Sequence, residues 1–260
     1  MGLLTGKVAL ITGGGNGIGR GIALQMAKDG AAVGVLDRNP EACHRVATSI
    51  SEAGQHAIAL PADVSNAAAV NEAVRKLADA FGAVTVLVHT AGIMPEGTID
   101  NTPEHDWDRV FAVNVKGAYL TCREVIPHMQ RAGGGSIILM ASITGVNGFP
   151  GLAAYSSTKG ALIALARAVA IDHAQEAIRA NSVSPGTIDS PMLHEFVAKQ
   201  ADPKRTREAF DEIQPRGRVG TIDEVVNVVT FLASDLSTLV SGTNIIVDGG
   251  ASVKGDQPRL

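Results

Sequence analysis

The stretch Lys7–Gly19, KVALITGGGNGIG, decides the fold that this sequence predicts. Its first half, Lys7–Thr12, is a short apolar run ended by glycines, as expected for a strand buried on both faces of a sheet. A helix is expected to follow over Gly17–Asp29. At such a strand-to-helix turn the backbone N–H groups point toward an anion, and the helix dipole favours negative charge. The stretch therefore predicts a phosphate-binding turn between a buried strand and a helix.

The remainder of the chain repeats this alternation of short apolar runs and helical segments. Further strands are expected at Ala32–Leu36, His56–Leu60, Val84–His89, Ser136–Ala141, Ile178–Val183 and Thr243–Val247. Further helices are expected over Glu41–Ala53, Ala67–Phe81, Thr102–Arg131, Ala153–Gln175 and Asp223–Ala233. Seven apolar runs separated by helices predict an α/β fold, a Rossmann-type doubly wound sheet of seven parallel strands with helices on both faces.

Composition argues against several classes of protein. The 260 residues are long enough for one sizeable core, and no repeat or linker suggests a second domain. A net charge of −4 and few aromatic residues argue against nucleic-acid binding. No apolar run is long enough to span a membrane, and neither cysteines nor histidines show a disulfide or metal spacing. We therefore expect a single domain over residues 1–260, cytoplasmic and without a metal.

The predicted phosphate turn has the features of a dinucleotide site. Gly13, Gly17 and Gly19 follow the spacing G-x-x-x-G-x-G, and a Cβ there would block close approach of a pyrophosphate. Asp37 closes the second strand 18 residues after Gly19, where a carboxylate can bond the ribose 2′-hydroxyl and repel a 2′-phosphate. This pattern predicts NAD as the cofactor. NADP is the alternative, because Arg38 can pair with a phosphate.

Tyr155 and Lys159 form a candidate acid/base pair. They lie four residues apart at the start of a predicted helix and therefore share one face. A nearby ammonium and the positive helix end favour the phenolate, so we expect Lys159 to lower the tyrosine pKa from its usual value of about 10. Tyr155 can then take a hydroxyl proton in oxidation or donate one in reduction. Ser142, at the end of the fifth strand, can hold the substrate oxygen by a hydrogen bond.

With these motifs the chain resembles the short-chain dehydrogenase/reductase family, of the compact type, over nearly its whole length. The resemblance rests on Thr12–Gly19, Asn114–Gly117, Ser142, Tyr155–Lys159, Pro185-Gly186 and Asp248–Gly250. It implies a catalytic tetrad of Asn114, Ser142, Tyr155 and Lys159, in which Asn114 holds a water that links Lys159 to solvent. It also implies a cofactor site made of Gly13, Gly15, Asn16, Gly17, Ile18, Gly19, Asp37, Arg38, Asp63, Val64, Thr90, Ala91, Gly92, Tyr155, Lys159, Pro185, Gly186, Ile188 and Ser190.

One motif departs from the family pattern. The usual Asn-Asn-Ala-Gly after the fourth strand is His89-Thr90-Ala91-Gly92 here. In the family these amides tie the sheet edge to the cofactor loop, and neither His89 nor Thr90 reproduces the donor and acceptor of an amide. The change therefore concerns local geometry and cofactor affinity rather than the reaction class. We expect His89 to be a structural histidine whose ring nitrogens have hydrogen-bond partners. The alternative is a histidine beside the cofactor that titrates at about pH 6.5 and introduces a pH dependence.

Two further segments are expected to serve the substrate and a second subunit. The stretch Ile188–Gln214 is polar and interrupted by prolines, which predicts a mobile substrate lid at about 188–215. The helix around Thr158–Asp172 is small and apolar on nearly every face, which favours a homodimer or homotetramer interface over burial beneath the lid. Apolar candidates for the wall of the substrate pocket are Met94, Ile143, Leu152, Ile188, Met192 and Phe196.

Three functions fit the sequence. The favoured one is an NAD-dependent oxidoreductase that moves a hydride between the cofactor and a secondary alcohol or ketone, and an NAD preference favours oxidation. The second is an NADPH-dependent 3-oxoacyl-thioester reductase, which Asp37, Asn16 and the acidic net charge disfavour. The third is a dinucleotide-binding sensor without catalysis, which is disfavoured because all four tetrad positions are filled.

Overall fold

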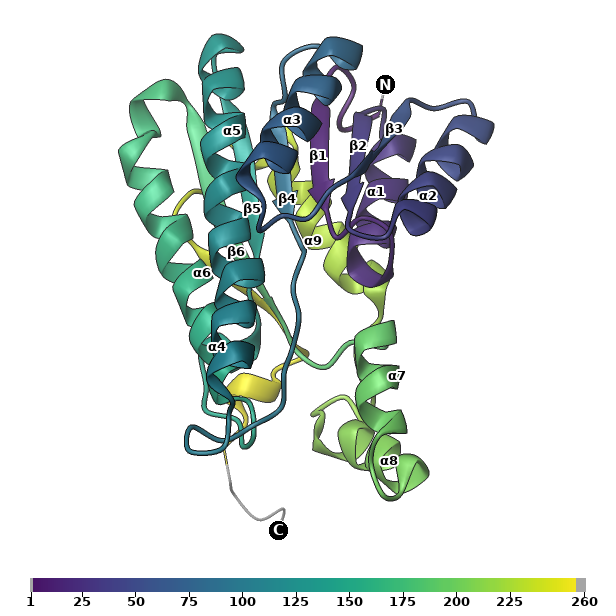
Figure 1. The fold of residues 1–260 in the computed structure, drawn as a ribbon, viewed down its shortest axis with the longest axis vertical. Coiled ribbons are helices and arrows are strands. Elements are labelled where there is room, and N and C mark those ends of the chain that lie inside the picture. Colours follow the sequence, from purple (N-terminus) through teal and green to yellow (C-terminus); the bar gives the residue numbers. More distant parts are fainter. Residues whose placement is uncertain (1, 256–260) are drawn as a thin grey trace.

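The strands form one parallel sheet in the computed structural model, which describes residues 2–255 (Figure 1). Their order in the sheet is β3-β2-β1-β4-β5-β6-β7. All seven predicted strands are confirmed, with ends that differ from the prediction by at most two residues. The strands are β1 Val8–Thr12, β2 Ala32–Asp37, β3 Ala57–Pro61, β4 Val86–His89, β5 Gly135–Met140, β6 Ile178–Pro185 and β7 Asn244–Val247.

Helices cover both faces of the sheet, as predicted. Helices α1, α2 and α9 pack on one face, and α3, α5 and α6 pack on the other (Figure 1). Within residues 2–255 no helix is long and apolar enough to cross a membrane. The α-helices are α1 Gly17–Lys28, α2 Pro40–Glu52, α3 Ala67–Phe81, α4 Glu104–Phe111, α5 Gly117–Arg131, α6 Ala153–Asp172, α7 Pro191–Ala198, α8 Pro203–Ile213 and α9 Ile222–Ala233.

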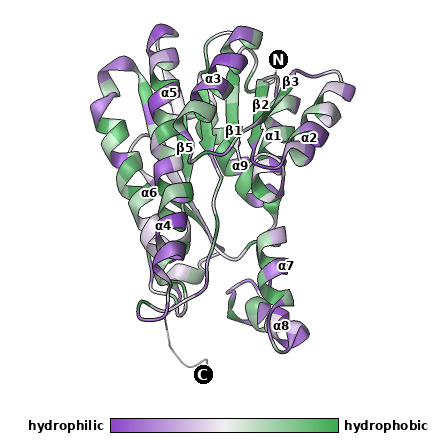
Figure 2. Ribbon diagram, in the orientation of Figure 1, coloured by the Kyte–Doolittle hydropathy of each residue, from purple (hydrophilic) through white to green (hydrophobic). Residues whose placement is uncertain are grey.

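The core lies in two layers, one on each side of the sheet. Every residue of β1 is buried, as predicted for the run Lys7–Thr12. Successive side chains alternate between the layers, so that Leu10 packs in the cluster with α3 and α5 and Ile11 packs in the cluster with α1 and α9. Figure 2 shows the central strands as predominantly hydrophobic, with hydrophilic residues spread over the outer helices. Burial on both faces explains why the strand sequences are continuous apolar runs.

The helix predicted over Thr102–Arg131 is one continuous rod with a π-helical segment in its middle. Helix α4 begins at Glu104, Ala112–Lys116 is π-helical, and α5 continues from Gly117. A π segment inserts extra backbone into the helix, and such segments are frequent at functional sites. It carries Asn114, whose side chain is completely buried. The sequence predicted the rod but not this local change of pitch.

The predicted lid contains two helices rather than irregular chain. Helices α7 and α8 extend below the sheet in Figure 1, on the side where the strands end. Pro191 and Pro203 occupy the first turns, and the residues just before them, Ser190 and Asp202, cap the helices by accepting backbone N–H groups with their side chains. Two of the prolines that we interpreted as interruptions are therefore helix starts, because proline at the first helical position loses no hydrogen bond. The third, Pro215, lies between α8 and α9. The Ser-Pro and Asp-Pro pairs were the signal that could have predicted both helices.

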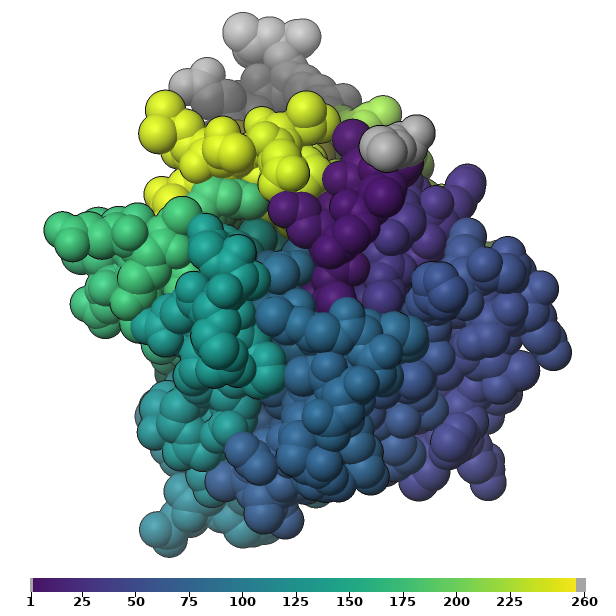
Figure 3. All heavy atoms as spheres, turned by 90° about the horizontal axis from the view of Figure 1, so that it is seen from above, coloured from purple at the N-terminus to yellow at the C-terminus, as the bar shows by residue number. Residues whose placement is uncertain are grey.

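The first residues of the chain contact the segment that follows α9 at the amino-terminal side of the sheet. The Lys7 ammonium lies 2.7 Å from the Asp235 carboxylate, which follows α9. Figure 3 shows the first residues, in purple, beside the segment near residue 240, in yellow. This side of the sheet lies opposite the side from which α7 and α8 extend (Figure 1).

Candidate active site

The predicted site residues meet at the carboxyl ends of the central strands. Strand β4 pairs with β1 and not with β3, which precedes it in sequence, so the strand order reverses between β1 and β4. Ligands of open α/β sheets bind at such a switch point. The register places Thr12 opposite His89, and His89 opposite Leu139 of β5. The glycine-rich turn, the segment after β4 and Ser142 therefore share one edge of the sheet.

The glycine-rich turn has the shape of a pyrophosphate cradle. Gly13 and Gly17 adopt φ angles of 63° and 51°, which favour glycine. A Cβ on Gly13 would come within 3.0 Å of the Ala91 backbone, and one on Gly15 would come within 2.9 Å of the Asp37 carboxylate. Asn16 caps α1, and its side chain accepts the Gly17 N–H at 2.9 Å. These residues fit a nicotinamide dinucleotide, because the open turn faces the amino end of a helix.

Asp37 is held rigidly beside this turn. Its carboxylate accepts the Gly15 N–H at 3.0 Å through one oxygen and the Asn39 N–H at 2.9 Å through the other. Asp63 lies on the adjacent loop, where hydrogen bonds from Ser65 lower its pKa and the charge of Arg38 adds to the effect. The anchored Asp37 carboxylate thus presents a fixed negative charge next to the cradle.

On the other side of the switch point, the segment after β6 is tied to β7 and to the lid stem. The Gly186 N–H donates to the Val247 carbonyl at 3.0 Å. Ile188 is buried and forms a short parallel bridge with Gly220, where a Cβ would strike the isoleucine side chain at 2.7 Å. Ser190 then begins α7 as its cap. The predicted nicotinamide-side residues therefore lie in one well-ordered stem.

Tyr155 and Lys159 are buried together at the start of α6. Only 4% of Lys159 and 8% of Tyr155 are exposed, and the ammonium lies 5.3 Å from the tyrosine ring centroid. Lys159 Nζ donates to the Met140 carbonyl at 2.7 Å, which ties α6 to the end of β5. Burial lowers the pKa of Lys159 to about 8.

The predicted lowering of the Tyr155 pKa by Lys159 is not what the isolated chain shows. Burial raises the pKa of Tyr155 to about 12, and a hydrogen bond with Ser142 opposes this rise. The phenol is thus protonated at neutral pH, because desolvation of the anion outweighs the stabilising contacts. Ser142 itself caps the short turn Ile143–Gly145 by accepting the Thr144 N–H at 3.2 Å.

Asn114 holds the loop after β4 against α6. Its Oδ1 accepts the Ile93 N–H at 2.9 Å, and its Nδ2 donates to the Ile93 carbonyl at 3.1 Å and to the Thr158 hydroxyl at 3.0 Å. Thr158 in turn donates to the Tyr155 carbonyl at 2.7 Å. Sequence reasoning missed Thr158, although its place between Tyr155 and Lys159 puts it on the buried face of α6. Both N–H groups of the Asn114 side chain thereby donate to protein acceptors.

Comparisons with known proteins agree with this arrangement. A family model described as enoyl-(acyl carrier protein) reductase matches residues 13–252. The meso-2,3-butanediol dehydrogenase of Serratia marcescens is 35% identical over 254 residues, which are 98% of each chain. A protein described as a short-chain dehydrogenase/reductase from Burkholderia xenovorans superposes with a TM-score of 0.94 at 32% identity, over 98% of this chain and 100% of its own. This chain belongs to the short-chain dehydrogenase/reductase family.

The predicted family and the predicted class, an oxidoreductase, are therefore confirmed for this short-chain dehydrogenase/reductase. The crystal structure of levodione reductase gives the same TM-score of 0.94 at 29% identity, over 97% of this chain and 100% of its own. The family binds NAD or NADP. In the part of the chain that the structure describes, no three His, Cys, Asp or Glu side chains gather as metal ligands.

His89, the departure from the family motif, is a buried and neutral residue of this short-chain dehydrogenase/reductase. Its Nδ1 lies 3.1 Å from the Thr12 hydroxyl and 3.2 Å from the Thr121 hydroxyl. Its Nε2 has no protein partner among residues 2–255. Burial, together with the charge of Lys159, lowers the pKa of His89 to about 3, so a titration near 6.5 does not occur in the folded state. We expected both ring nitrogens of this structural histidine to have hydrogen-bond partners, but within residues 2–255 only Nδ1 has them.

This pKa makes the stability of the protein depend on pH through His89. Below pH 6.5 the unfolded chain binds a proton that the folded chain binds only near pH 3, so acid destabilises the fold. The free energy of unfolding should fall by about 1.4 kcal/mol per pH unit from this group. Urea unfolding of the wild type and of His89→Asn at two pH values below 6.5 measures the difference. Equal slopes in both proteins would contradict the assignment.

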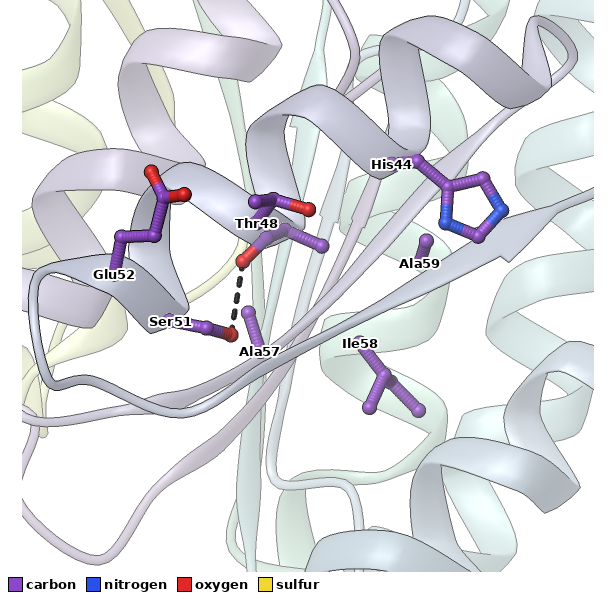
Figure 4. A pocket seen from close by; sticks show the side chains of 8 residues that line it. His44, Thr48, Ser51, Glu52, Ala57, Ile58 and Ala59 are labelled. Atoms are coloured by element: carbon purple, nitrogen blue, oxygen red, sulfur yellow. Dashed lines mark hydrogen bonds between the residues drawn. The ribbon is translucent and has the colours of Figure 1, made fainter.

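A groove of about 460 Å³ lies between α2 and the edge strand β3, away from the switch point (Figure 4). None of the predicted site residues lines it, and its Ser51 hydroxyl is already bonded to the Ala47 carbonyl at 3.0 Å. A cavity of about 260 Å³ beside Ile188 and Gln214 lies at the lid stem. The candidate active site is therefore identified by the chemistry of its side chains and not by the volume of a pocket. The groove is lined by His44, Ala47, Thr48, Ser51, Glu52, Ala57, Ile58 and Ala59.

The residues predicted to wall the substrate pocket come from separate segments. Leu152 pairs with Gly97 in a short bridge, which brings the loop after β4 to the start of α6. Phe196 packs edge-on against Phe210 with ring centroids 5.8 Å apart, so it also joins α7 to α8. Met192 is 40% exposed on α7. The predicted wall residues are Met94 after β4, Ile143 and Leu152 between β5 and α6, Ile188 between β6 and α7, and Met192 and Phe196 on α7.

Proposed function

We propose that this short-chain dehydrogenase/reductase is an NAD-dependent dehydrogenase of secondary alcohols that also reduces the corresponding ketones. The observation that carries the proposal is the burial of Tyr155 and Lys159 together, with the half-buried Ser142 bonded to Tyr155, at the sheet edge that holds the glycine-rich turn. A phenol and an ammonium are removed from water here, which costs free energy. Titratable groups perturbed in this way cluster at functional sites.

Chain residues hold the cofactor at two places in this proposal. Gly13–Gly19 and the amino end of α1 bind the pyrophosphate, and Asp37 accepts hydrogen bonds from the adenosine ribose. Asp63 and Val64 lie beside the adenine, and the Pro185–Ser190 stem holds the nicotinamide. When bound, the nicotinamide ring supplies the acceptor or donor of the hydride. NAD is preferred over NADP because the Asp37 carboxylate is anchored at both oxygens and cannot turn away from a 2′-phosphate.

Tyr155 is the general acid and base of the proposed reaction. In ketone reduction its hydroxyl donates a proton to the substrate oxygen, and in oxidation its phenolate takes that proton. Ser142 donates a hydrogen bond to the same oxygen and so fixes its position. The Lys159 ammonium lies 5.3 Å from the tyrosine ring centroid, where its charge would oppose the desolvation that raises the Tyr155 pKa. Asn114 keeps the loop at Ile93 in place. All four residues act at the carboxyl ends of β4 and β5.

The substrate is proposed to be a small secondary alcohol with an apolar part. Related proteins carry the names of a butanediol dehydrogenase and a levodione reductase. The wall residues Met94, Ile143, Leu152 and Met192 are uncharged, which suits a neutral alcohol better than a charged carrier. A 3-oxoacyl-thioester reductase is less well supported, because Asp37 opposes NADPH. A sensor without catalysis is less well supported, because Tyr155 and Lys159 are buried together.

The same proposal extends to the organisation of the protein. We infer a single catalytic domain with a substrate lid at 188–215 and a homodimer or homotetramer in the cytoplasm. Helix α6 supports the oligomer, because Ala164, Ala168 and Ile171 leave a small apolar strip of its outer face exposed. Light scattering of the purified protein distinguishes these states from a monomer.

The pH profile tests the proposed role of Tyr155. Oxidation needs the phenolate, and the pKa of Tyr155 is raised to about 12 in the cofactor-free chain, so kcat/KM for the alcohol should rise with pH. The rise should approach about tenfold per pH unit over the alkaline range before it levels off. Ketone reduction uses the protonated phenol and should not rise. An oxidation rate that stays flat from neutral to alkaline pH would count against Tyr155 as the base.

A further inference from the structure

His89 lies at the end of β4, and within residues 2–255 only one of its two ring nitrogens has hydrogen-bond partners. The imidazole is completely buried, and Nδ1 faces the hydroxyls of Thr12 and Thr121. Thr121 has an alternative use for its proton, since its hydroxyl lies 3.0 Å from the helix carbonyls of Gly117 and Ala118. The Thr12 hydroxyl has no such alternative. Among residues 2–255 its only other contacts are donors.

The hydrogen bonds of Thr12 determine which nitrogen of His89 carries the proton. Thr12 Oγ1 accepts the N–H groups of Thr90 and Ala91, each at 3.2 Å, so its oxygen is used by two donors. Its own proton must therefore point to His89 Nδ1, which accepts it. The ring proton is then on Nε2. In the other tautomer Nδ1–H could donate to Thr121, but the Thr12 proton would be left without an acceptor.

The segment Thr90–Gly92 touches both halves of the proposed site. A Cβ on Gly13 would lie 3.0 Å from the backbone of Ala91 and 3.1 Å from the Thr90 hydroxyl, so this segment packs directly on the glycine-rich turn. The Thr90 hydroxyl also donates to the Thr12 carbonyl. At the other end, a Cβ on Gly92 would lie 3.6 Å from Lys159 Nζ. A shift of this short segment would change the distance between cofactor and acid/base pair.

We propose that His89 is a positioning residue, which fixes the Thr12 hydroxyl as the neutral Nε2–H tautomer and thereby holds Thr90–Gly92 between the cofactor and Lys159. It touches neither substrate nor cofactor and acts through Thr12. The inference rests on the proposed function, because it assumes that the glycine-rich turn binds NAD. An imidazole suits the role because Nδ1 occupies the place of an asparagine side-chain oxygen, one bond beyond Cγ.

The first test reads the tautomer in the cofactor-free protein. Nitrogen-15 NMR of the histidine side chains distinguishes a protonated from an unprotonated ring nitrogen, and the signals lost in His89→Asn are those of His89. We expect an unprotonated Nδ1 and a protonated Nε2 at neutral pH. A protonated Nδ1 would overturn the proposal. This readout does not depend on whether the protein binds NAD or turns over any substrate.

The second test compares two replacements of His89. His89→Leu removes the acceptor for Thr12, and we expect NAD⁺ to bind about tenfold more weakly, a change of about 1.4 kcal/mol. His89→Asn places an oxygen where Nδ1 was, and we expect binding within about threefold of the wild type. Thr121→Val is the matched control, since it removes the other hydroxyl at Nδ1 but leaves Thr12 intact, and it should bind NAD⁺ like the wild type.

The outcomes of these tests distinguish a positioning role of His89 from a role in packing alone, and both from a failure of the proposed function. If His89→Leu binds NAD⁺ like the wild type, or if His89→Asn binds as poorly as His89→Leu, the proposal is wrong. If His89→Leu does not fold, the NMR tautomer and the His89→Asn affinity still decide. If the wild type itself fails to bind NAD⁺, the proposed function fails, while the tautomer measurement still tests the link between His89 and Thr12.

Discussion

Tyr155→Phe should lower turnover by about a thousandfold and leave NAD⁺ affinity within about threefold of the wild type. The substitution removes only the hydroxyl that exchanges a proton with the substrate oxygen. The ring stays buried beside Lys159, where it is 8% exposed, so the fold loses little more than the contact with Ser142. Steady-state rates with a panel of secondary alcohols and vicinal diols, together with NAD⁺ titrations, measure both quantities.

The chain provides a matched control for this experiment. Tyr119 is the only other tyrosine, it is 49% exposed on α5, and it lies beneath the Arg123 guanidinium rather than near the site. Tyr119→Phe should therefore keep full activity. A Tyr155→Phe enzyme that retains more than about a tenth of the wild-type turnover would contradict the proposed acid/base role. Loss of NAD⁺ binding in Tyr155→Phe would instead indicate a structural effect on the cofactor site.

Asp37→Asn should reduce the preference for NAD⁺ over NADP⁺ by about 10-fold to 100-fold. Two like charges about 4 Å apart repel by about 1 kcal/mol in bulk water and about 4 kcal/mol near a protein surface, and the substitution removes one of the charges. The expected change of about 1.4 to 2.8 kcal/mol lies between these limits. Asparagine keeps an acceptor oxygen for either the Gly15 or the Asn39 N–H, so the turn is largely retained. Dissociation constants of both cofactors for wild type and variant measure the change.

Two companion variants make this result interpretable. Asp37→Ala loses both backbone contacts and should weaken both cofactors, which separates loop support from charge. Arg38→Gln should weaken NADP⁺ binding only if Arg38 pairs with the 2′-phosphate. An unchanged ratio in Asp37→Asn would show that its carboxylate does not select the cofactor. A wild type that prefers NADP⁺ would direct the substrate search to ketones and oxoacyl thioesters.

The strands and the site's location were predictable because their signals are local. A strand buried on both faces needs an uninterrupted apolar run, and a turn that approaches an anion needs glycine, so both are written in adjacent residues. The predicted strand at Lys7–Thr12 differs from β1 by one residue for this reason. Because parallel strands end at one edge of a sheet, the sequence alone predicts that the glycine-rich turn, Ser142 and Tyr155 lie close together.

The predicted lid at 188–215 contains local signals for helices that we misinterpreted. Pro191 and Pro203 were taken as interruptions, although each follows a capping residue and begins a helix. Proline stops a helix only from within, because its missing N–H costs nothing in the first turn. Reading Ser190 and Asp202 as caps would have predicted α7 and α8 from sequence.

The sequence by itself determined the order of strands and helices, the position of the glycine-rich turn and the identity of the residues that we propose as the acid/base pair. Only the tertiary structure decided their electrostatics and hydrogen bonding. The raised pKa of Tyr155 follows from burial by segments far away in the chain, and the low pKa of His89 does too. The link from His89 to Thr12 spans 77 residues. Desolvation and hydrogen-bond partners depend on such distant neighbours, which no local pattern of residues specifies.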